Sequence, residues 1–136
     1  MKMRFNETTV AVHVRKDFGK CFDFYAEKIG LAPVFGDRNG PYTSFAAKEG
    51  DPPCFAIFVG KEATAYKGYA YPEASAQPDT LVATIPTDDI AGDYRRLKEK
   101  GVEFLGEVQR IEEWGGVFAL FRDPEGNLFS LSDAGL

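Results

Sequence analysis

The 136-residue chain has few of the residues from which metal sites and disulfide frameworks are built, since it contains one histidine and two cysteines. Cys21 and Cys54 fit neither a CxxC motif nor the spacing of a metal finger. We therefore interpret both as small buried hydrophobic side chains rather than as redox groups.

Long apolar runs and an excess of cations are also missing. No stretch of about 18 apolar residues is present, and the first ten residues lack the apolar core and cleavage site of a signal peptide, so we expect a cytoplasmic protein with no membrane partner. The 16 Lys and Arg residues against 21 Asp and Glu give a net charge of −5. Because this sign repels phosphate backbones, we expect no nucleic-acid partner. The acidity of this protein belongs to residues 80–136, which carry six basic and eleven acidic side chains.

The residues that are present favour one α+β domain spanning residues 1–136. Hydrophobic residues make up 44% of the chain and aromatic residues 14%, which is enough for a packed core. Residues 8–14 predict a strand, and the aromatic spacing from Asp17 to Gly30 predicts an amphipathic helix. Three extended pieces follow, at residues 33–35, 42–47 and 54–59. The first module, about residues 8–59, therefore has the order βαβββ.

The second half repeats this order. Its pieces are a strand at 80–85, a helix from Asp88 or Asp89 to Gly101, and strands at 102–105, 108–114, 116–121 and 128–131. Sliding the halves by about 73 residues pairs Thr9 with Val82 and Ile57 with Ser130. The second module spans about residues 80–133. Residues 60–79 contain three tyrosines and are interpreted as a surface linker, with a lid or a dimer arm as alternatives.

Three further features of the chain occur together. They are the tandem modules, the pairing of Phe24-Tyr25 with Ile29-Gly30-Leu31, and the turn Asp123-Pro124-Glu125-Gly126-Asn127. In these features the chain resembles the vicinal oxygen chelate superfamily, which groups glyoxalase I, extradiol dioxygenases, and fosfomycin- and bleomycin-resistance proteins. The resemblance runs from about Thr8 to Asp133. It implies an α+β fold in which two tandem βαβββ modules form a cup-shaped, curved mixed sheet around a cavity, and it implies a homodimer.

The resemblance also implies four metal-ligand positions, one on the first and one on the last strand of each module. Metal-using members fill these positions with His or Glu, because a divalent ion needs three or four N or O ligands. Here the positions carry Thr9, Ile57, Val82 and Ser130. A slip of one residue brings no better ligand, and His13 alone cannot build the site. We therefore expect no metal and no other cofactor, and we disfavour metal-dependent glyoxalase, dioxygenase and fosfomycin-modifying activities.

The cavity that the resemblance implies is mostly apolar and aromatic, with a few polar points. Such a lining suits the binding of a bulky organic molecule more than the stabilisation of a developing charge. The predicted ligand-binding residues are Thr9, His13, Phe45, Phe55, Ile57, Trp114, Phe118, Leu120 and Ser130. For Ile57 and Leu120, a place in the core is an equal alternative.

Three kinds of side chain suggest which ligand this cavity takes. Trp114, the only tryptophan, is predicted to stack on an aromatic ligand, with core or dimer packing as the alternative. Glu112 and Glu113 precede it and would attract a cationic ligand, although a solvated strand end is the plainer explanation. His13 is the natural general acid or base if the cavity is an enzyme site, because its ordinary pKa is near neutrality.

The leading hypothesis is a metal-free small-molecule-binding protein that resembles the bleomycin-resistance group and sequesters a drug or another bulky organic ligand, cationic or aromatic. The first alternative is a metal-free isomerase or lyase that uses His13 as acid or base. The second is an interaction protein whose cavity is filled by its own side chains. The sequence leaves open whether the protein is an enzyme, with binding alone preferred.

Overall fold

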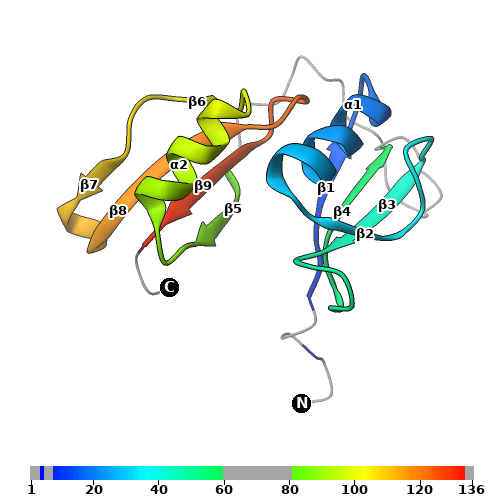
Figure 1. The fold of residues 1–136 in the computed structure, drawn as a ribbon, viewed down its shortest axis with the longest axis horizontal. Coiled ribbons are helices and arrows are strands. Elements are labelled where there is room, and N and C mark those ends of the chain that lie inside the picture. Colours follow the sequence, from blue (N-terminus) through cyan, green and yellow to red (C-terminus); the bar gives the residue numbers. More distant parts are fainter. Residues whose placement is uncertain (1–3, 5–7, 60–80, 134–136) are drawn as a thin grey trace, which may run out of the picture. The chain divides into compact units, whose positions relative to one another are not determined.

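The computed structural model describes residue 4, residues 8–59 and residues 81–133, so the predicted linker at 60–79 lies outside the described residues. The chain divides into two compact units, Met1–Pro78 and Asp79–Leu136. Each unit contains one β-sheet with a helix packed on it (Figure 1). The fold is therefore α+β with two sheets, as the sequence predicts.

The first unit has the predicted order βαβββ. Its elements are β1 (Val10–Val14), α1 (Phe18–Asp23), the π-helix η2 (Phe24–Ile29), β2 (Ala32–Phe35), β3 (Tyr42–Ala46) and β4 (Pro53–Val59). The strands lie side by side in the order β1-β4-β3-β2. Strand β1 runs parallel to β4, and the other neighbours are antiparallel.

The helical segment of the first unit begins and ends where the sequence predicts. The side chain of Asp17 caps α1 by accepting a hydrogen bond from the backbone N–H of Lys20 at 3.0 Å. The segment ends at Gly30, whose φ of 90° is accessible to glycine at little cost. Between these ends the chain widens into a π-helix, so that the N–H of Gly30 donates to the carbonyl of Tyr25.

The second unit repeats the order with one added turn. Its elements are β5 (Leu81–Pro86), α2 (Ile90–Glu99), β6 (Glu103–Phe104), β7 (Gln109–Ile111), the 3₁₀ turn η5 (Glu112–Trp114), β8 (Gly116–Arg122) and β9 (Leu128–Ser132). The strands lie in the order β5-β9-β8-β6, and β7 also pairs with β8. As in the first unit, the first strand runs parallel to the last.

Aromatic side chains form the core of each unit, between the sheet and its helix. In the first unit Tyr25 packs on Phe55 with ring centroids 4.5 Å apart, and both Tyr25 and Phe22 contact Phe45. In the second unit the rings of Phe121 and Phe129 stack at 5.5 Å and both are almost fully buried. Since apolar burial is the main stabilising contribution, these clusters hold each helix on one face of its sheet.

The turn between β8 and β9 is organised by a single carboxylate. The Asp123 side chain accepts hydrogen bonds from the backbone N–H groups of Glu125 and Asn127 at 2.9 and 2.8 Å, and from the Asn127 amide at 2.8 Å. Gly126 has a φ of 86°, which favours glycine. The turn chemistry expected from the sequence is therefore present, and it fixes the register of the two strands.

One prediction about the cysteines is confirmed and the other is wrong. Cys21 is buried, whereas Cys54 is exposed because it lies near the start of β4 on the face away from the helix. Among the described residues, no helix has the length and apolar character needed to cross a membrane.

Candidate functional site

Each sheet has one face covered by its helix and one face turned away from it, which we call the far face. Side chains alternate between the two faces of a strand, and directly paired residues on neighbouring strands share a face. Ala11 pairs with Ala56 and His13 pairs with Phe58, so these residues lie on the far face of the first sheet. The alternation places Thr9, just before β1, on the same side, where it is exposed.

Three predicted ligand-binding residues lie on the other face. Phe55 and Ile57 pair with Val10 and Val12 on β1, and Phe45 pairs with Phe55 on β3. All three are buried, and the rings of Phe45 and Phe55 contact Tyr25 of the helical segment. The expectation that they share a wall with Thr9 and His13 is therefore wrong, and for Ile57 the core alternative holds. The physical reason is that β4 presents its odd-numbered residues to the helix.

The far face of the first sheet instead carries a row of four rings, one from each strand, which we call the aromatic row. The rings are His13 on β1, Phe58 on β4, Tyr42 on β3 and Phe35 on β2. His13 pairs with Phe58 across β1 and β4, and Tyr42 pairs with Phe58 across β3 and β4. Phe35 pairs with Ser44, another far-face residue, and its ring lies 6.1 Å from that of Tyr42.

Of these four side chains, only His13 is among the predicted ligand-binding residues. The sequence does show that Phe35, Tyr42 and Phe58 each fall within a predicted strand. Their alignment in one row depends on how the strands pair, which the sequence does not reveal.

The surroundings of His13 favour the neutral form of its imidazole. Partial burial is the larger cause and the Arg15 guanidinium the smaller, and both lower the pKa of His13 below its ordinary value of 6.5. The imidazole meets the ring of Phe58 edge-on, with centroids 4.5 Å apart. No hydrogen bond joins it to a carboxylate among the described residues. A catalytic imidazole is commonly oriented by such a partner, so His13 lacks this aid.

In the second sheet the structure brings together three predicted residues. Leu120 pairs with Ser130, and Phe118 pairs with Ser132, so Phe118, Leu120 and Ser130 share a face. The residues between them, including Phe121 and Phe129, form the core under α2, so the shared face is the far face. Leu120 is partly exposed, whereas Ser130 is buried and donates to the carbonyl of Leu131 at 3.2 Å.

The segment before β8 is described in part. Trp114 ends the turn η5 and is followed by Gly115 with a φ of 70°, but the Trp114 side chain lies outside what the structure describes. Glu112 is exposed and forms an ion pair with Arg110 at 2.9 Å, and Glu113 is exposed. Exposed pairs of this kind are weak, so Glu112 stays available to a competing cation.

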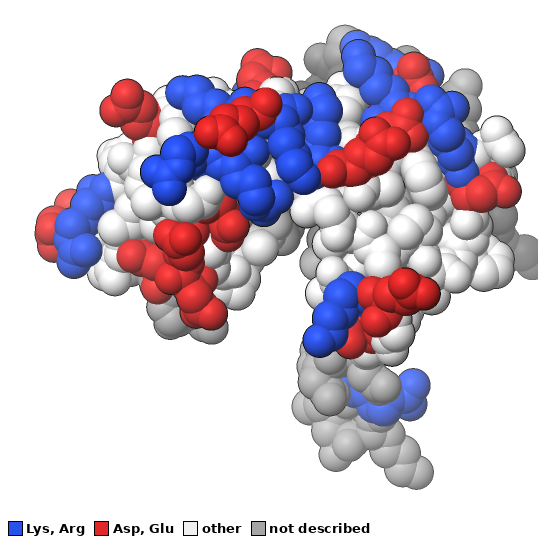
Figure 2. Space-filling view, in the orientation of Figure 1, with Lys and Arg blue, Asp and Glu red and all other residues white. Residues whose placement is uncertain are grey.

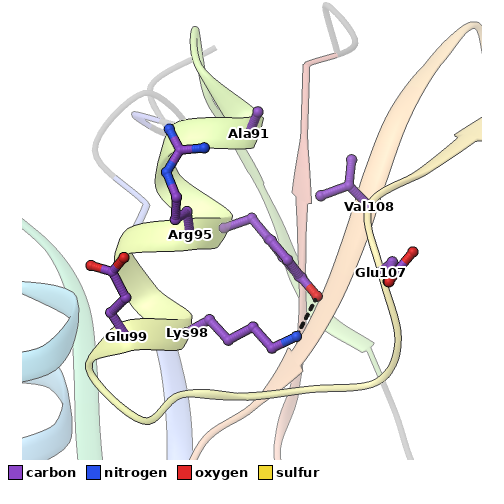
Figure 3. Close-up of a pocket in the computed structure, with 7 residues that line it drawn as sticks. Ala91, Arg95, Lys98, Glu99, Glu107 and Val108 are labelled. Atoms are coloured by element: carbon purple, nitrogen blue, oxygen red, sulfur yellow. Dashed lines mark hydrogen bonds between the residues drawn. The ribbon is translucent and has the colours of Figure 1, made fainter.

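A pocket of about 570 Å³ opens elsewhere in the second unit, beside α2. It is lined by Ala91, Tyr94, Arg95, Lys98, Glu99, Glu107 and Val108. The Lys98 ammonium donates to the Tyr94 hydroxyl at 3.2 Å (Figure 3). That hydroxyl donates to the carbonyl of Gly106 at 3.2 Å. Lys and Arg side chains gather over the same helix (Figure 2). These hydrogen bonds connect the loop between β6 and β7 to α2. None of the predicted ligand-binding residues is among the residues that line the pocket.

The two βαβββ units define a protein of the glyoxalase and bleomycin-resistance fold class. The family model described as Glyoxalase/Bleomycin resistance protein/Dioxygenase superfamily matches residues 8–131. The Bacillus subtilis protein YetH is 33% identical over 128 residues, which cover 92% of this chain and 95% of YetH. The chain therefore belongs to the glyoxalase/bleomycin resistance protein/dioxygenase superfamily.

Solved structures agree with this assignment. A superfamily member from Sphaerobacter thermophilus has a TM-score of 0.68 and 24% identity, with 92% of this chain and 94% of that chain covered. TnmS3, an antibiotic binding protein from a Streptomyces species, has a TM-score of 0.62 and 25% identity, with 96% of each chain covered. The first likeness shows the fold, and the second is to a protein described as antibiotic binding.

The positions at which metal-using relatives would hold an ion do not fit one here. Ser130 pairs with Thr84 on the far face of the second sheet. Between the first and last strands of the first sheet, the far-face pairs are Ala11 with Ala56 and His13 with Phe58, while Ile57, the expected counterpart of Ser130, faces the helix. These positions supply hydroxyl and hydrocarbon groups and a single imidazole, which are too few good ligands for a divalent ion. Within residues 8–59 and 81–133, no three His, Cys, Asp or Glu side chains gather closely enough to hold a metal ion.

Proposed function

We propose that the protein is a small-molecule-binding protein, which holds a bulky organic ligand on the far face of a sheet and sequesters it without changing it. One observation carries the proposal: the far faces present partly exposed aromatic and aliphatic side chains, with Phe35, Tyr42 and Leu120 the most open, next to a few neutral polar groups. Apolar walls with sparse polar points are typical of ligand sites. In this proposal the protein works as a cytoplasmic homodimer.

Two further observations support binding rather than catalysis. His13 has no carboxylate partner among the described residues, so a general base at this position would lack the group that commonly orients it. TnmS3, which resembles this chain over nearly its whole length, is an antibiotic binding protein. Trp114 is proposed to contribute a stacking surface, and Glu112 and Glu113 to attract a cationic group of the ligand.

The test is a titration of the full chain with bleomycin, followed by the fluorescence of Trp114, the single tryptophan. We expect saturable quenching with micromolar or tighter affinity, and recovery of the unchanged drug by mass spectrometry. Leu120→Ala and Ile85→Ala form a matched pair, because the two side chains are 38% and 37% exposed but only Leu120 lies on the far face, whereas Ile85 pairs with Leu131 on the face that α2 covers. We expect Leu120→Ala alone to weaken binding. Equal effects of the two variants, or no saturable binding, would contradict the proposal.

A metal-free isomerase or lyase with His13 as general base is the second candidate. One observation favours it: burial and Arg15 lower the pKa of His13, which favours the neutral form that can accept a proton. The test is whether the unmodified chain converts the bound ligand to an isomer or a cleavage product. If it does and His13→Gln does not, the protein is an enzyme and the sequestration proposal is wrong. The third candidate, an interaction protein acting through residues 60–79, concerns residues outside the described ranges.

A further inference from the structure

The aromatic row has the dimensions of an extended planar ligand rather than of a single ring. It takes one ring from each of four adjacent strands, in the order His13, Phe58, Tyr42 and Phe35. Because neighbouring strands lie about 4.8 Å apart, the row extends over about 14 Å. A one-ring ligand would cover one strand position and leave the other rings in water.

The exposed area of the row also matches a small molecule. Phe35 is 66% exposed and Tyr42 is 41% exposed, while His13 and Phe58 are partly buried. Since an aromatic side chain offers about 200 Å² of surface, the row exposes roughly 300 Å² in total. A stable protein interface needs about 800 Å² from each partner, so the row alone is too small to bind a second copy of the chain.

At a pH above the pKa of His13, the four side chains of the row and the far-face positions next to them carry no formal charge, although the Arg15 guanidinium acts on His13 at one end of the row. The adjacent far-face positions are Ala11, Ser44, Ala56 and Cys54. The charged group nearest His13 along β1 is Arg15, which lies beyond the last residue of the strand. Recognition on this surface therefore depends on ring area and shape, with Tyr42 Oη and the His13 imidazole as hydrogen-bonding groups at separate points of the row.

We propose that the aromatic row binds a planar, polycyclic aromatic ligand of at least three fused rings, whichever charge that ligand carries. This inference rests on the proposed function and specifies the chemical class of its ligand. Stacking and edge-to-face contacts with several rings at once give the binding energy. Bleomycin-type molecules that are long and flexible would use the far faces differently, since they lack a fused ring system of this length.

Four probes separate ring number from charge. Acridine-9-carboxylate and 9-aminoacridine have three rings and opposite charges, whereas pyridine-4-carboxylate and 4-aminopyridine have one ring and the same two charges. We expect both acridines to bind the full chain with dissociation constants within about threefold of each other, and both pyridines to bind at least about tenfold more weakly, because an added ring contact contributes a factor of roughly three to ten. Binding is measured by acridine fluorescence and by amide shifts in ¹⁵N NMR spectra.

Substitutions on the edge strand β2 and on its neighbour β3 test where the ligand binds. Phe35→Ala removes one ring of the row, and Val34→Ala is its control because Val34 is an exposed neighbour on the same strand that adds no ring. We expect Phe35→Ala and Tyr42→Ala each to weaken acridine binding about three- to tenfold, and Val34→Ala to change it less than twofold. Both row side chains are exposed, so the variants should stay folded.

Several results would overturn the inference. Equal affinity for pyridines and acridines, a strong preference for one charge, or equal effects of Phe35→Ala and Val34→Ala would each contradict it. A change of oligomeric state in Phe35→Ala, measured by light scattering, would make the row a contact between copies instead. If bleomycin quenches Trp114 but no acridine binds, the inference fails and the proposed function stands. If neither binds, both fail.

Discussion

His13 and Phe58 face each other across β1 and β4, edge to face, with 4.5 Å between ring centroids and 63° between ring planes. An aromatic ring edge carries partial positive charge and its face partial negative charge, so this geometry is favourable for a neutral imidazole. The contact also removes part of the imidazole from water, which disfavours its charged form.

The first prediction concerns the titration of His13. Burial and the Arg15 guanidinium lower the pKa of His13 below 6.5, so the folded protein should titrate at a lower pH than a histidine in an unfolded peptide. His13 is the only histidine, and its imidazole signals in a ¹H NMR titration are therefore unambiguous. Arg15→Gln should raise the pKa of His13 partway toward 6.5, because it removes the effect of the guanidinium but not the effect of burial. A pKa at or above 6.5 in the unmodified chain would contradict the argument.

The same shift predicts how stability changes with pH. Between the folded and the unfolded pKa the unfolded chain binds more protons, so the contribution of His13 is fully present above about pH 6.5 and is lost as the pH falls through the folded pKa. His13→Gln removes the titrating group. The difference in urea midpoint between the unmodified chain and this variant should therefore decrease on acidification from pH 7.5 to pH 5 and be constant above pH 7.5. A constant difference over the whole range would be evidence against the linkage.

The second prediction compares two phenylalanines that the sequence does not distinguish. Phe45 is fully buried against Phe22, Tyr25 and Phe55, so Phe45→Ala should cost about 3–5 kcal/mol of unfolding free energy. Phe35 is mostly exposed, so Phe35→Ala should change stability by less than about 0.5 kcal/mol. Urea unfolding followed by circular dichroism measures both. If Phe45→Ala changed the unfolding free energy only slightly, the assignment of Phe45 to the core would be wrong, and the prediction that it binds ligand would stand again.

The order of elements could be predicted from the sequence because each helix has a capping aspartate and a terminal glycine, and each strand is bounded by turn residues. In β9 the faces are also predictable, because Ser130 and Ser132 alternate with Phe129 and Leu131. The structure places the serines on the far face and the apolar residues under α2.

The faces of β4 could not be predicted in this way. Phe55, Ala56, Ile57 and Phe58 are apolar on both faces, so alternation gives no signal for which side the helix covers. The repeat pairs Ile57 with Ser130, but Ile57 lies under the helix and Ser130 lies on the far face, so the two halves are out of register by one residue at these strands. A shift of one residue exchanges the faces, and this is why the predicted site in the first module included core residues.

The third prediction concerns Gly36, which leads from β2 into the loop before Tyr42. Gly36 and Gly50 both have positive φ, at 79° and 91°, but only at Gly36 would a Cβ atom collide with a backbone carbonyl, that of Tyr42. Gly50→Ala should therefore cost about 1–2 kcal/mol for the left-handed conformation alone. Gly36→Ala should cost at least about 1 kcal/mol more, because the crowded backbone must move. Thermal and urea unfolding of the two variants give the comparison, and equal losses would show that the carbonyl adjusts freely.

The fourth prediction concerns Asp123, whose carboxylate accepts three hydrogen bonds within the β8–β9 turn. Asp123 is buried, so Asp123→Ala leaves the N–H groups of Glu125 and Asn127 without their acceptor and should cost about 2–4 kcal/mol of unfolding free energy. Asp88→Ala is the control, because Asp88 is exposed and its carboxylate has no hydrogen-bond partner among the described residues.

Hydrogen exchange distinguishes a local from a global effect of Asp123→Ala. If the carboxylate holds the turn, the amide of Asn127 should exchange much faster in this variant, and the amides of β8 and β9 nearest the turn should follow, while those of the first unit stay unchanged. Because the turn fixes the pairing of Leu120 with Ser130, the variant should also weaken ligand binding to the far face of the second sheet. Unchanged exchange at Asn127, or the same loss of stability in Asp88→Ala, would mean that the turn is held by its backbone alone.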